Sequence, residues 1–291
     1  IRLLGCDVGL LELENLGFHR RNLDALLGLL ASPSGLILVT GPTGAGKTTT
    51  LYACLNRLHD GSRKINTIED PVEYAIAGVR QTEVNAKQSL DFPELLPNVL
   101  RQAPDVIMIG EVRDPVTAET SVLAANSGHL VLATAHAPVA TASINSMLAL
   151  GVNPRFLGAS LLGAVSQRLV RRLCEHCKTG FDVSGAPETF DDVRRWLEPG
   201  EGEKIYTSSG CDQCHGEGFT GRTGVLEVLR VSRNIRRMIH SRATTAELRR
   251  AAVGEGMLDL RRSALLKVAQ GITNMEEVIR TIPGEHLLPE S

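Results

Sequence analysis

The residues best suited to chemistry form one short glycine-rich run. Residues 41–48 read Gly-Pro-Thr-Gly-Ala-Gly-Lys-Thr, the phosphate-loop pattern Gly-x-x-x-x-Gly-Lys-Thr. Such a loop points backbone N–H groups and the positive end of a helix at phosphate oxygens, while Lys47 pairs with the β- and γ-phosphates and Thr48 holds Mg²⁺. The run predicts a nucleoside triphosphate site rather than an ordinary glycine-rich turn. Its expected binding residues are Gly41, Pro42, Thr43, Gly44, Ala45, Gly46, Lys47, Thr48 and Thr49.

Carboxylates follow an apolar run downstream of this loop. Residues 64–68 lead into Glu69 and Asp70, and Glu73 comes shortly after. A strand that ends here would deliver these carboxylates to the edge of a parallel sheet, where open α/β folds bind ligands. A solvated acidic loop is the alternative, and the segment alone does not decide between the two.

A second acidic motif ends the apolar run 106–109. Glu111 follows that run after one glycine. Beside a phosphate loop, a carboxylate in this position would polarise the attacking water or support Mg²⁺ through water. Arg113 and Asp114 come next, and we interpret them as an ion pair that fixes the loop, with ordinary surface charges as the alternative.

Two histidines flank the apolar run 130–134, which predicts another strand. Either His129 or His136 could donate a hydrogen bond to a γ-phosphate. A single histidine is more often a structural residue, so both interpretations stay open for each ring.

Four cysteines form two Cys-x-x-Cys pairs. Cys174 and Cys177 are followed, after about 33 residues, by Cys211 and Cys214. Four thiolates close a tetrahedral Zn²⁺ shell without a position for substrate, so the predicted metal is structural. The spacing exceeds the roughly 15–20 residues of common modules and leaves room for a polar insertion around Trp196. Redox disulfides are the competing interpretation, which a reducing cytoplasm disfavours.

The remaining cysteines and the neighbouring histidines are less informative. His176 and His215 adjoin the cysteine pairs and could replace one ligand, although four thiolates suffice. Cys6 and Cys54 lie in apolar surroundings and are interpreted as buried packing residues. Because each Cys-x-x-Cys turn is too short to make a core, we expect loss of the metal to unfold residues 171–225.

Parallel strands joined by helices would bring these motifs to one edge of a sheet. Apolar β-type runs predict strands at 36–40, 64–69, 106–110 and 130–134, with helices between them. Helical periodicity predicts further helices that include residues 246–252 and 276–280.

The composition indicates a globular protein. Of the 291 residues, 43% are hydrophobic and 22% are charged, and no apolar run reaches the roughly 18 residues that a membrane span requires. The net charge of −2 and the aromatic content of 3% argue against a nucleic-acid partner. The sequence shows no signal peptide either, so we expect a cytoplasmic location.

Four motifs occur in an order that resembles a known family. They are GPTGAGKTTTLY, TIEDPVEY, LRQAPDVIMIGEVRD and GHLVLATAH. They resemble the Walker A, Asp, Walker B and His boxes of secretion ATPases, the RecA-like hexameric motors of type II secretion and type IV pilus assembly. The segments GRTGVLEV and GITNMEEVIR also look like this family, so the resemblance covers nearly the whole chain.

The resemblance implies ATP as the nucleotide and assigns roles to individual residues. The expected catalytic residues are Glu111, Glu69, Asp70, Glu73, His136 and Arg113. Arginines expected to neutralise charge at subunit borders are Arg80, Arg101, Arg113 and Arg222. In the family, the tetracysteine insertion accompanies secretion and pilus-extension ATPases, which favours assembly over retraction.

The chain also departs from the family pattern. Where members usually read Leu-Arg-x-x-Leu-Arg-Gln-Asp-Pro-Asp, Pro97 replaces an arginine and Ala103 replaces an acid. The His box continues with His136, Ala137 and Pro138 in place of His-Thr-Asn. These changes put turnover in doubt, but not nucleotide binding.

The expected fold is α/β with three parts. They are a RecA-like P-loop NTPase core at 11–170, a small tetracysteine zinc-binding subdomain at 171–225 and a helical C-terminal subdomain at 226–291. Because the sequence begins with Ile1 rather than Met, we expect residues 1–10 to be the end of a preceding N-terminal domain and its linker.

The expected function is Mg²⁺-dependent ATP hydrolysis that powers pseudopilus or type IV pilus assembly, or type II protein secretion. The expected cofactors are ATP, Mg²⁺ and Zn²⁺. The expected assembly is a homo-hexamer that binds platform and docking proteins of the inner membrane from the cytoplasm. Two alternatives are a nucleotide-binding scaffold with weak or no hydrolysis, and a RecA-like nucleic-acid translocase, which would need the basic grooves and stacking aromatics that the composition disfavours.

Overall fold

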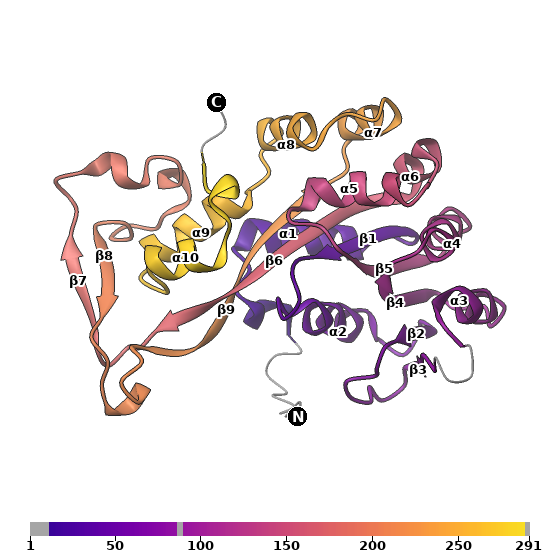
Figure 1. Cartoon of the computed structure of the whole chain (residues 1–291), viewed down its shortest axis with the longest axis horizontal. Coiled ribbons are helices and arrows are strands. Elements are labelled where there is room, and N and C mark those ends of the chain that lie inside the picture. The colour runs from indigo at the N-terminus through magenta and orange to yellow at the C-terminus, as the bar shows by residue number, and fades with distance from the viewer. Residues whose placement is uncertain (1–11, 86–89, 289–291) are drawn as a thin grey trace.

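A large twisted sheet crosses the centre of the molecule, and a small hairpin extends beyond it (Figure 1). The computed structural model describes residues 12–85 and 90–288. Cys6 and the expected linker at 1–10 lie outside the described residues.

The central sheet has seven strands in the order β3-β2-β4-β5-β1-β6-β9. The strands are β1 (Gly35–Thr40), β2 (Ile65–Glu69), β3 (Arg80–Glu83), β4 (Val106–Val112), β5 (Leu130–Ala135), β6 (Leu161–Leu173) and β9 (Phe219–Arg230). Neighbours run parallel except β6 and β9, which are antiparallel. Therefore β1, β2, β4 and β5 all end at the same edge of the sheet, which is where such folds bind ligands.

Helices cover both faces of this sheet because its inner strands are apolar on both sides. Along β1, Leu36 and Leu38 pack into one hydrophobic cluster, and Ile37 and Val39 into another. The second cluster contains residues of α1 (Arg20–Leu30), α2 (Lys47–Leu58) and the 3₁₀ turn η2 (Leu13–Leu16). The first cluster contains residues of α3 (Phe92–Leu100), α4 (Pro115–Asn126), α5 (Ala140–Ala149), α6 (Pro154–Ser160), α7 (Arg233–His240) and α8 (Thr245–Gly254).

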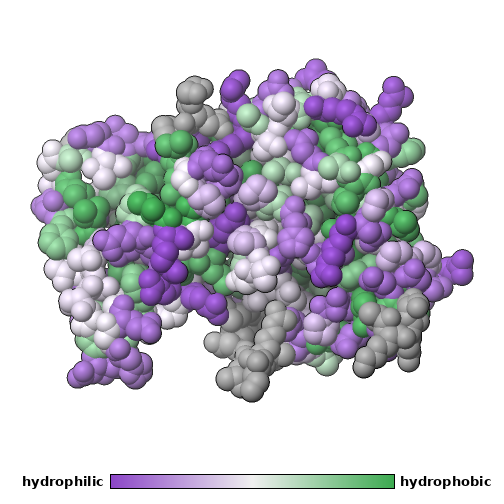
Figure 2. All heavy atoms as spheres, in the orientation of Figure 1, coloured by the Kyte–Doolittle hydropathy of each residue, from purple (hydrophilic) through white to green (hydrophobic). Residues whose placement is uncertain are grey.

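A third cluster lies beyond the sheet. There Phe190 and Val193 pack against Leu260, Leu266 and Val278 from the C-terminal helices. This region comprises the hairpin β7 (Lys178–Asp182) and β8 (Lys204–Ser208), the helices α9 (Leu260–Ala269) and α10 (Met275–Thr281), and the 3₁₀ turns η4 (Pro187–Phe190), η5 (Arg194–Trp196), η6 (Asp212–Cys214) and η7 (Gly284–His286). Figure 2 shows hydrophobic side chains on the surface here, and Phe181 and Ile279 are more than half exposed.

Two long strands connect this region to the sheet. β6 continues through residues 170 and 171, and β9 through residues 225 and 226. The expected domain boundaries therefore fall inside paired strands, and the division into three parts stays a prediction.

The elements expected from the sequence are present, but three strands of the central sheet and both strands of the β7–β8 hairpin were not expected. The strands predicted at 36–40, 64–69, 106–110 and 130–134 match β1, β2, β4 and β5 within two residues at each end. Helices α8 and α10 contain the two segments with helical periodicity. The sequence did not reveal β3, β6 or β9, and the mixed α/β class with a parallel sheet is confirmed.

Candidate functional site

The glycine-rich loop joins β1 to α2 and has a backbone that requires glycine. Gly41 has φ 144° and Gly46 has φ 85°. A Cβ atom at Gly41 would come within 2.5 Å of the Gln167 carbonyl oxygen, and one at Gly46 within 3.3 Å of Gln167 Nε2. Helix α2 begins at Lys47, so its unpaired first-turn N–H groups open onto this loop. The geometry fits phosphate binding at a helix N-terminus.

Lys47 lies within the loop. Its Nζ atom donates to the carbonyl oxygens of Gly41 at 2.9 Å and of Pro42 at 3.0 Å. Burial lowers the pKa of Lys47, and Arg168 lowers it further, whereas the attraction of Glu111 raises it. A phosphate at the loop would offer this half-buried ammonium group stronger acceptors than two carbonyl groups.

Glu111 lies in β4 at the same sheet edge, and two basic side chains hold its carboxylate. Arg113 donates to one oxygen, and His136 contacts the other. Burial alone would raise the pKa of Glu111, but the interactions with Arg113 and His136 outweigh it, so the pKa lies below its usual value. The carboxylate is thus charged and oriented, but both of its oxygens are occupied.

Glu69 is buried, and both of its carboxylate oxygens accept hydrogen bonds from other residues of the protein. It is the last residue of β2 and only 2% exposed. Tyr52 and Thr67 donate to it through their hydroxyl groups, and Gln81 Nε2 donates at 3.1 Å. Burial raises the pKa of Tyr52, and the hydrogen bond to Glu69 and its charge raise it further. Glu69 therefore belongs to a strand end, as the first of the two interpretations expected, and it ties α2 to β2 and β3.

The other acidic residues of this segment are more open. Asp70 is 45% exposed and lies 4.0 Å from Arg113. The backbone N–H of Glu73 faces the Tyr52 hydroxyl at 3.4 Å. Asp70 thus shares Arg113 with Glu111 across the sheet edge, while Glu73 lies next to the network around Glu69.

The expected ion pair between Arg113 and Asp114 is wrong. Asp114 is the N-cap of α4, and its carboxylate accepts from the Thr117 N–H at 2.8 Å and from the Thr117 hydroxyl at 2.6 Å. Capping uses the short side chain for the free N–H groups of the helix. Arg113 turns to Glu111 and Asp70 instead.

The two histidines lie at opposite ends of β5. His136 follows the carboxyl end of the strand and reaches Glu111. His129 precedes the strand, and its Nδ1 lies 3.0 Å from the carbonyl oxygen of Ala124 at the end of α4. Parallel pairing with β1 places His129 at the edge opposite the phosphate loop, so its role is structural.

The candidate arginines lie in four different places, and all are exposed. Arg80 begins β3 at the sheet border, and Arg101 caps the C-terminus of α3. Arg222 of β9 faces Arg171 of β6 in register. Of the four, Arg113 contacts the carboxylates of the site, and the role of the others at a subunit border stays a prediction.

Two residues of β6 brace the site, and neither was expected. Gln167 donates through Nε2 to the Ala45 carbonyl at 2.6 Å and accepts from the Thr50 hydroxyl at 2.7 Å. Arg168, which is 4% exposed, donates to the carbonyls of Gln167 at 3.0 Å and Pro138 at 2.8 Å. These side chains connect the phosphate loop, the first turn of α2 and the loop that carries His136.

Glu227 of β9 makes a further internal connection. One oxygen of its buried carboxylate accepts from the Ala140 N–H at 2.6 Å, and the other from the Leu260 N–H at 2.8 Å. These N–H groups belong to the first turns of α5 and α9. Burial raises the pKa of Glu227, although both hydrogen bonds oppose that shift.

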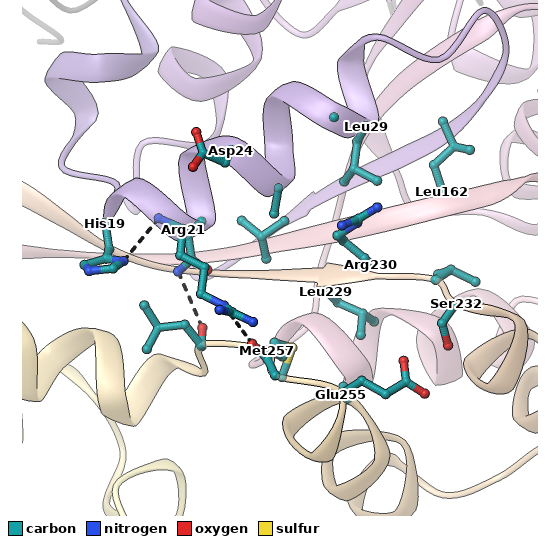
Figure 3. Close-up of a pocket in the computed structure, with 18 of the residues that line it drawn as sticks. His19, Arg21, Asp24, Leu29, Leu162, Leu229, Arg230, Ser232, Glu255 and Met257 are labelled. Carbon is teal, nitrogen blue, oxygen red and sulfur yellow. Dashed lines mark hydrogen bonds between the residues drawn. The ribbon is translucent and has the colours of Figure 1, made fainter. Parts of the chain in front are cut away.

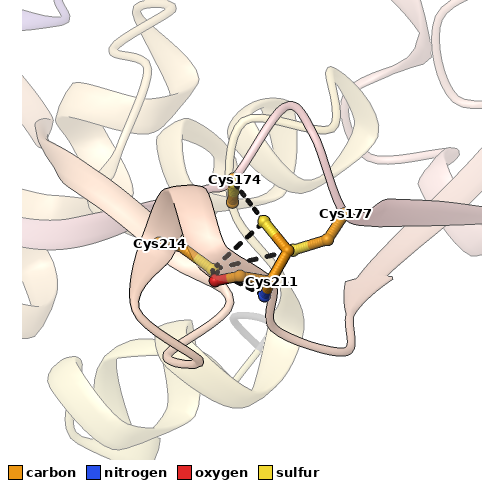
Figure 4. A group of neighbouring side chains, drawn as sticks. All are labelled: Cys174, Cys177, Cys211 and Cys214. Atoms are coloured by element: carbon orange, nitrogen blue, oxygen red, sulfur yellow. Dashed lines mark hydrogen bonds between the residues drawn. The ribbon is translucent and has the colours of Figure 1, made fainter.

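The four paired cysteines meet at one point (Figure 4). Their Sγ atoms all lie within 4.8 Å of one another, and the Cys174–Cys211, Cys177–Cys214 and Cys211–Cys214 separations are 3.8, 3.8 and 3.7 Å. A disulfide bond would need about 2.05 Å, so these are free thiols. Backbone N–H groups of Cys211 and Gly218 point at Cys214 Sγ from 3.1 and 3.2 Å. The arrangement suits thiolates gathered around a metal ion.

A large cavity of about 890 Å³ lies elsewhere, between α1 and the segment at 252–258 (Figure 3). Arg21 reaches across it and donates through Nε to the Gly256 carbonyl at 3.0 Å. Phosphate-loop residues do not line this cavity. Within residues 12–85 and 90–288, no helix is long and apolar enough to cross a membrane.

Comparisons with known proteins agree with this geometry. The family model described as "Type II/IV secretion system protein" matches residues 1–280. The chain therefore belongs to the type II/IV secretion system protein family. It is 41% identical over 285 residues to type II secretion system protein E of Pseudomonas aeruginosa and 41% identical over 283 residues to the type IV pilus assembly ATPase PilB of Thermus thermophilus.

Among solved structures, this family member resembles the pilus retraction motor PilT with bound ADP. The TM-score is 0.68 at 28% identity, over 92% of this chain and 66% of that one. The Pseudomonas match covers 98% of this chain and 56% of the relative, and the Thermus match covers 97% and 32%. The chain thus spans about half or less of the curated relatives' length.

Proposed function

We propose that the protein is the ATP-hydrolysing part of a motor that powers type II secretion or type IV pilus assembly. The observation that carries this proposal is the meeting of the phosphate loop with Glu111, Arg113 and His136 at one sheet edge. Membership of the secretion family and the similarity to proteins named as ATPases or motors support it. The expected homo-hexamer and its inner-membrane platform and docking partners, approached from the cytoplasm, are part of the same proposal.

Each group at this edge has a separate task. The loop N–H groups and Lys47 bind and neutralise the phosphates, and Thr48 at the start of α2 would hold the Mg²⁺ that accompanies ATP. That ion would supply charge neutralisation during phosphoryl transfer. Glu111 orients the attacking water, Arg113 can offset new negative charge, and His136 can donate a hydrogen bond to it.

The same contacts favour a second candidate, a nucleotide-binding scaffold with little hydrolysis. Arg113 and His136 occupy both oxygens of Glu111, so water has to displace one of them before it can be polarised. The low pKa of Glu111 also makes it a weaker base. We interpret the arrangement as a resting state that a neighbouring subunit opens, which predicts slow turnover by this chain alone.

For the cysteine cluster we propose a structural Zn²⁺ site. Zinc–sulfur bonds of about 2.3 Å in a tetrahedron give sulfur–sulfur edges of about 3.8 Å. The separations of 3.7–3.8 Å among Cys174, Cys177, Cys211 and Cys214 fit that geometry. The ion would join the ends of the β7–β8 insertion and would take no part in hydrolysis.

Paired variants separate the motor from the scaffold. We expect Lys47→Ala to weaken ATP binding at least about tenfold, because a charged hydrogen bond to phosphate is lost. Glu111→Gln should bind ATP like the unaltered chain but release phosphate about 10²–10⁴ times more slowly. The measurements are calorimetry for binding and phosphate release for turnover. Lys204→Ala and Glu119→Gln, which alter exposed residues away from the site, are the matched controls.

The outcomes differ for the two candidates. Binding without phosphate release, in the isolated chain and in its assembled oligomer, would favour the scaffold. Unchanged phosphate release in Glu111→Gln would contradict the assigned role of Glu111. Salt-sensitive binding of an oligonucleotide would instead favour the alternative of a nucleic-acid translocase.

A further inference from the structure

A second, smaller cavity lies where α1, the Trp196 segment and α9 meet. We call it the Lys267 pocket, and its volume is about 300 Å³. Phosphate-loop residues and the cysteines do not line it. Its lining residues are Phe18, His19, Arg20, Trp196, Glu198, Ser263, Leu266, Lys267, Gln270 and Ile272.

Lys267 is a buried cation in this lining. It is only 7% exposed, and lysine is almost never buried to this extent without a partner. Among the described residues, no group accepts a hydrogen bond from its ammonium group or forms an ion pair with it. Burial, and to a smaller extent the positive charge of Arg172, lower the pKa of Lys267 to about 8. The pocket therefore has one uncompensated positive charge.

The charged groups around Lys267 do not compensate it. His19 accepts from the Arg21 N–H at 3.2 Å, and its pKa is lowered by burial and then by Lys267. Glu201 already accepts from the Glu198 N–H at 3.0 Å and from Gln270 Nε2 at 3.4 Å. The local field around the ammonium group is therefore positive.

Arginines add to that positive field at the pocket rim. Arg20 lines the pocket directly, and the guanidinium of Arg195 stacks on the Trp196 ring at 4.0 Å. Glu198 is the carboxylate in the lining, so cations outnumber acids there.

The rest of the lining suits the body of a small organic molecule. Phe18, Trp196, Leu266 and Ile272 provide apolar walls, and Ser263 and Gln270 add hydrogen-bonding groups. A volume of about 300 Å³ is at the lower end for ligand pockets. The large cavity of Figure 3 shares His19, Arg20 and Trp196 with this pocket and gives an open approach to it.

We propose that the Lys267 pocket binds a small organic anion, with the ammonium group of Lys267 as counter-ion to its carboxylate or phosphate group and Trp196 against its apolar part. The site is separate from the nucleotide site, because the two linings share no residue. It joins α1 to the Trp196 segment and α9, so an occupied pocket would fix these three elements to one another.

Trp196 makes the proposal directly measurable, because it is the single tryptophan of the chain. Benzoate and phenyl phosphate are suitable probes, and inorganic phosphate tests the anion without an apolar body. We expect a saturable change of tryptophan fluorescence with one or both aromatic anions. Phenyl phosphate alone would indicate a phosphate ligand, and benzoate alone a carboxylate ligand.

Three variants locate the binding. Lys267→Met keeps the length of the side chain and should weaken binding at least about tenfold, since it removes the charged hydrogen-bond donor. Lys204→Met, at an exposed lysine of β8, should not change it. Lys47→Ala should not change it either, which excludes the phosphate loop as the source of the signal. If Lys267→Met does not fold, an amine-labelling experiment on the unaltered chain replaces this variant. The same anions should then protect Lys267 from the label.

Binding should also depend on pH in one direction. The pKa of Lys267 in the empty pocket is about 8. The affinity for the anion should therefore fall as the pH rises through 8, because the ammonium group loses its proton. Equal affinity in Lys267→Met, loss of the signal in Lys47→Ala, or no saturable signal with any probe would each overturn the proposal.

Discussion

Removal of the proposed Zn²⁺ from the cysteine cluster tests which parts of the chain depend on that ion for their stability. The change is Cys211→Ser together with Cys214→Ser, or a chelator on the unaltered protein. Structural zinc contributes about 10–16 kcal/mol in small modules, far more than a single side-chain contact. The β7–β8 hairpin offers little to replace it, because isolated two-stranded hairpins are marginal in water and Phe181 is 53% exposed.

The structure limits how far the damage should spread. The sequence suggested that the whole segment 171–225 depends on the metal, but Phe190 and Val193 are buried in the third cluster with α9 and α10. Burial of one such side chain is worth roughly 1.5–3 kcal/mol, which favours the folded insertion without the ion. We therefore expect residues 174–182 and 204–218 to lose order, while the part around Phe190 stays attached.

Hydrogen exchange resolved by segment measures this prediction. Faster exchange should be confined to the hairpin and the cysteine turns, and ATP binding by calorimetry should change by less than about threefold. A control, Cys54→Ala, alters a buried cysteine of α2 and should instead affect the core. The reasoning fails if freshly reduced protein contains no zinc, or if the double variant loses ATP binding together with the hairpin.

Three further predictions concern stability. Tyr52→Phe should cost about 1–3 kcal/mol, since buried Glu69 loses a donor, and an unchanged urea midpoint would contradict it. Ala103 has a left-handed backbone conformation with φ 49°, which is strained for alanine. Ala103→Gly should therefore stabilise the fold by up to about 1 kcal/mol in the same assay, and a loss of stability would contradict this backbone strain. Hydrogen bonds from Arg280 and Arg171 outweigh the effect of burial and lower the pKa of Glu277 to about 2. The protein should therefore lose roughly 2–3 kcal/mol of stability as the pH falls from 4.5 towards 2. Glu277→Gln should make the stability depend less on pH in this range.

The features that the sequence predicted correctly have local signals. β1, β2, β4 and β5 are apolar runs because both faces of a central parallel strand are covered, and the glycine and cysteine motifs have fixed spacings. The position of Ala103 also has a local explanation. The resemblance to secretion ATPases implies an acid where Ala103 lies, and Asp is enriched at positive φ, which alanine disfavours.

The missed features depend on contacts between distant parts of the chain. The second half of β6 reads Gln167-Arg168-Leu169-Val170-Arg171-Arg172-Leu173, which has no apolar run to reveal a strand. Gln167 forms hydrogen bonds with Thr50 and Ala45, which lie 117 and 122 residues away in the sequence. Glu227 meets Ala140 across 87 residues. No periodicity of one segment encodes such partners, so Gln167, Arg168 and Glu227 looked like ordinary polar positions.

The pairing of β6 explains why we expect the proposed nucleotide site and the proposed zinc site to act independently although one strand connects them. β1 pairs with β6 up to Ser166, and β9 pairs with it from Gly163 to Leu173. Gln167 and Arg168 therefore lie just past the last pair with β1, where they are anchored to Ala45 and Pro138. Disorder that begins at Cys174 must first break the β9 pairs and the Arg171–Glu277 contacts before it reaches them. The paired strands β6 and β9 thus keep disorder in the cysteine turns from reaching the phosphate loop, although they hold both in place.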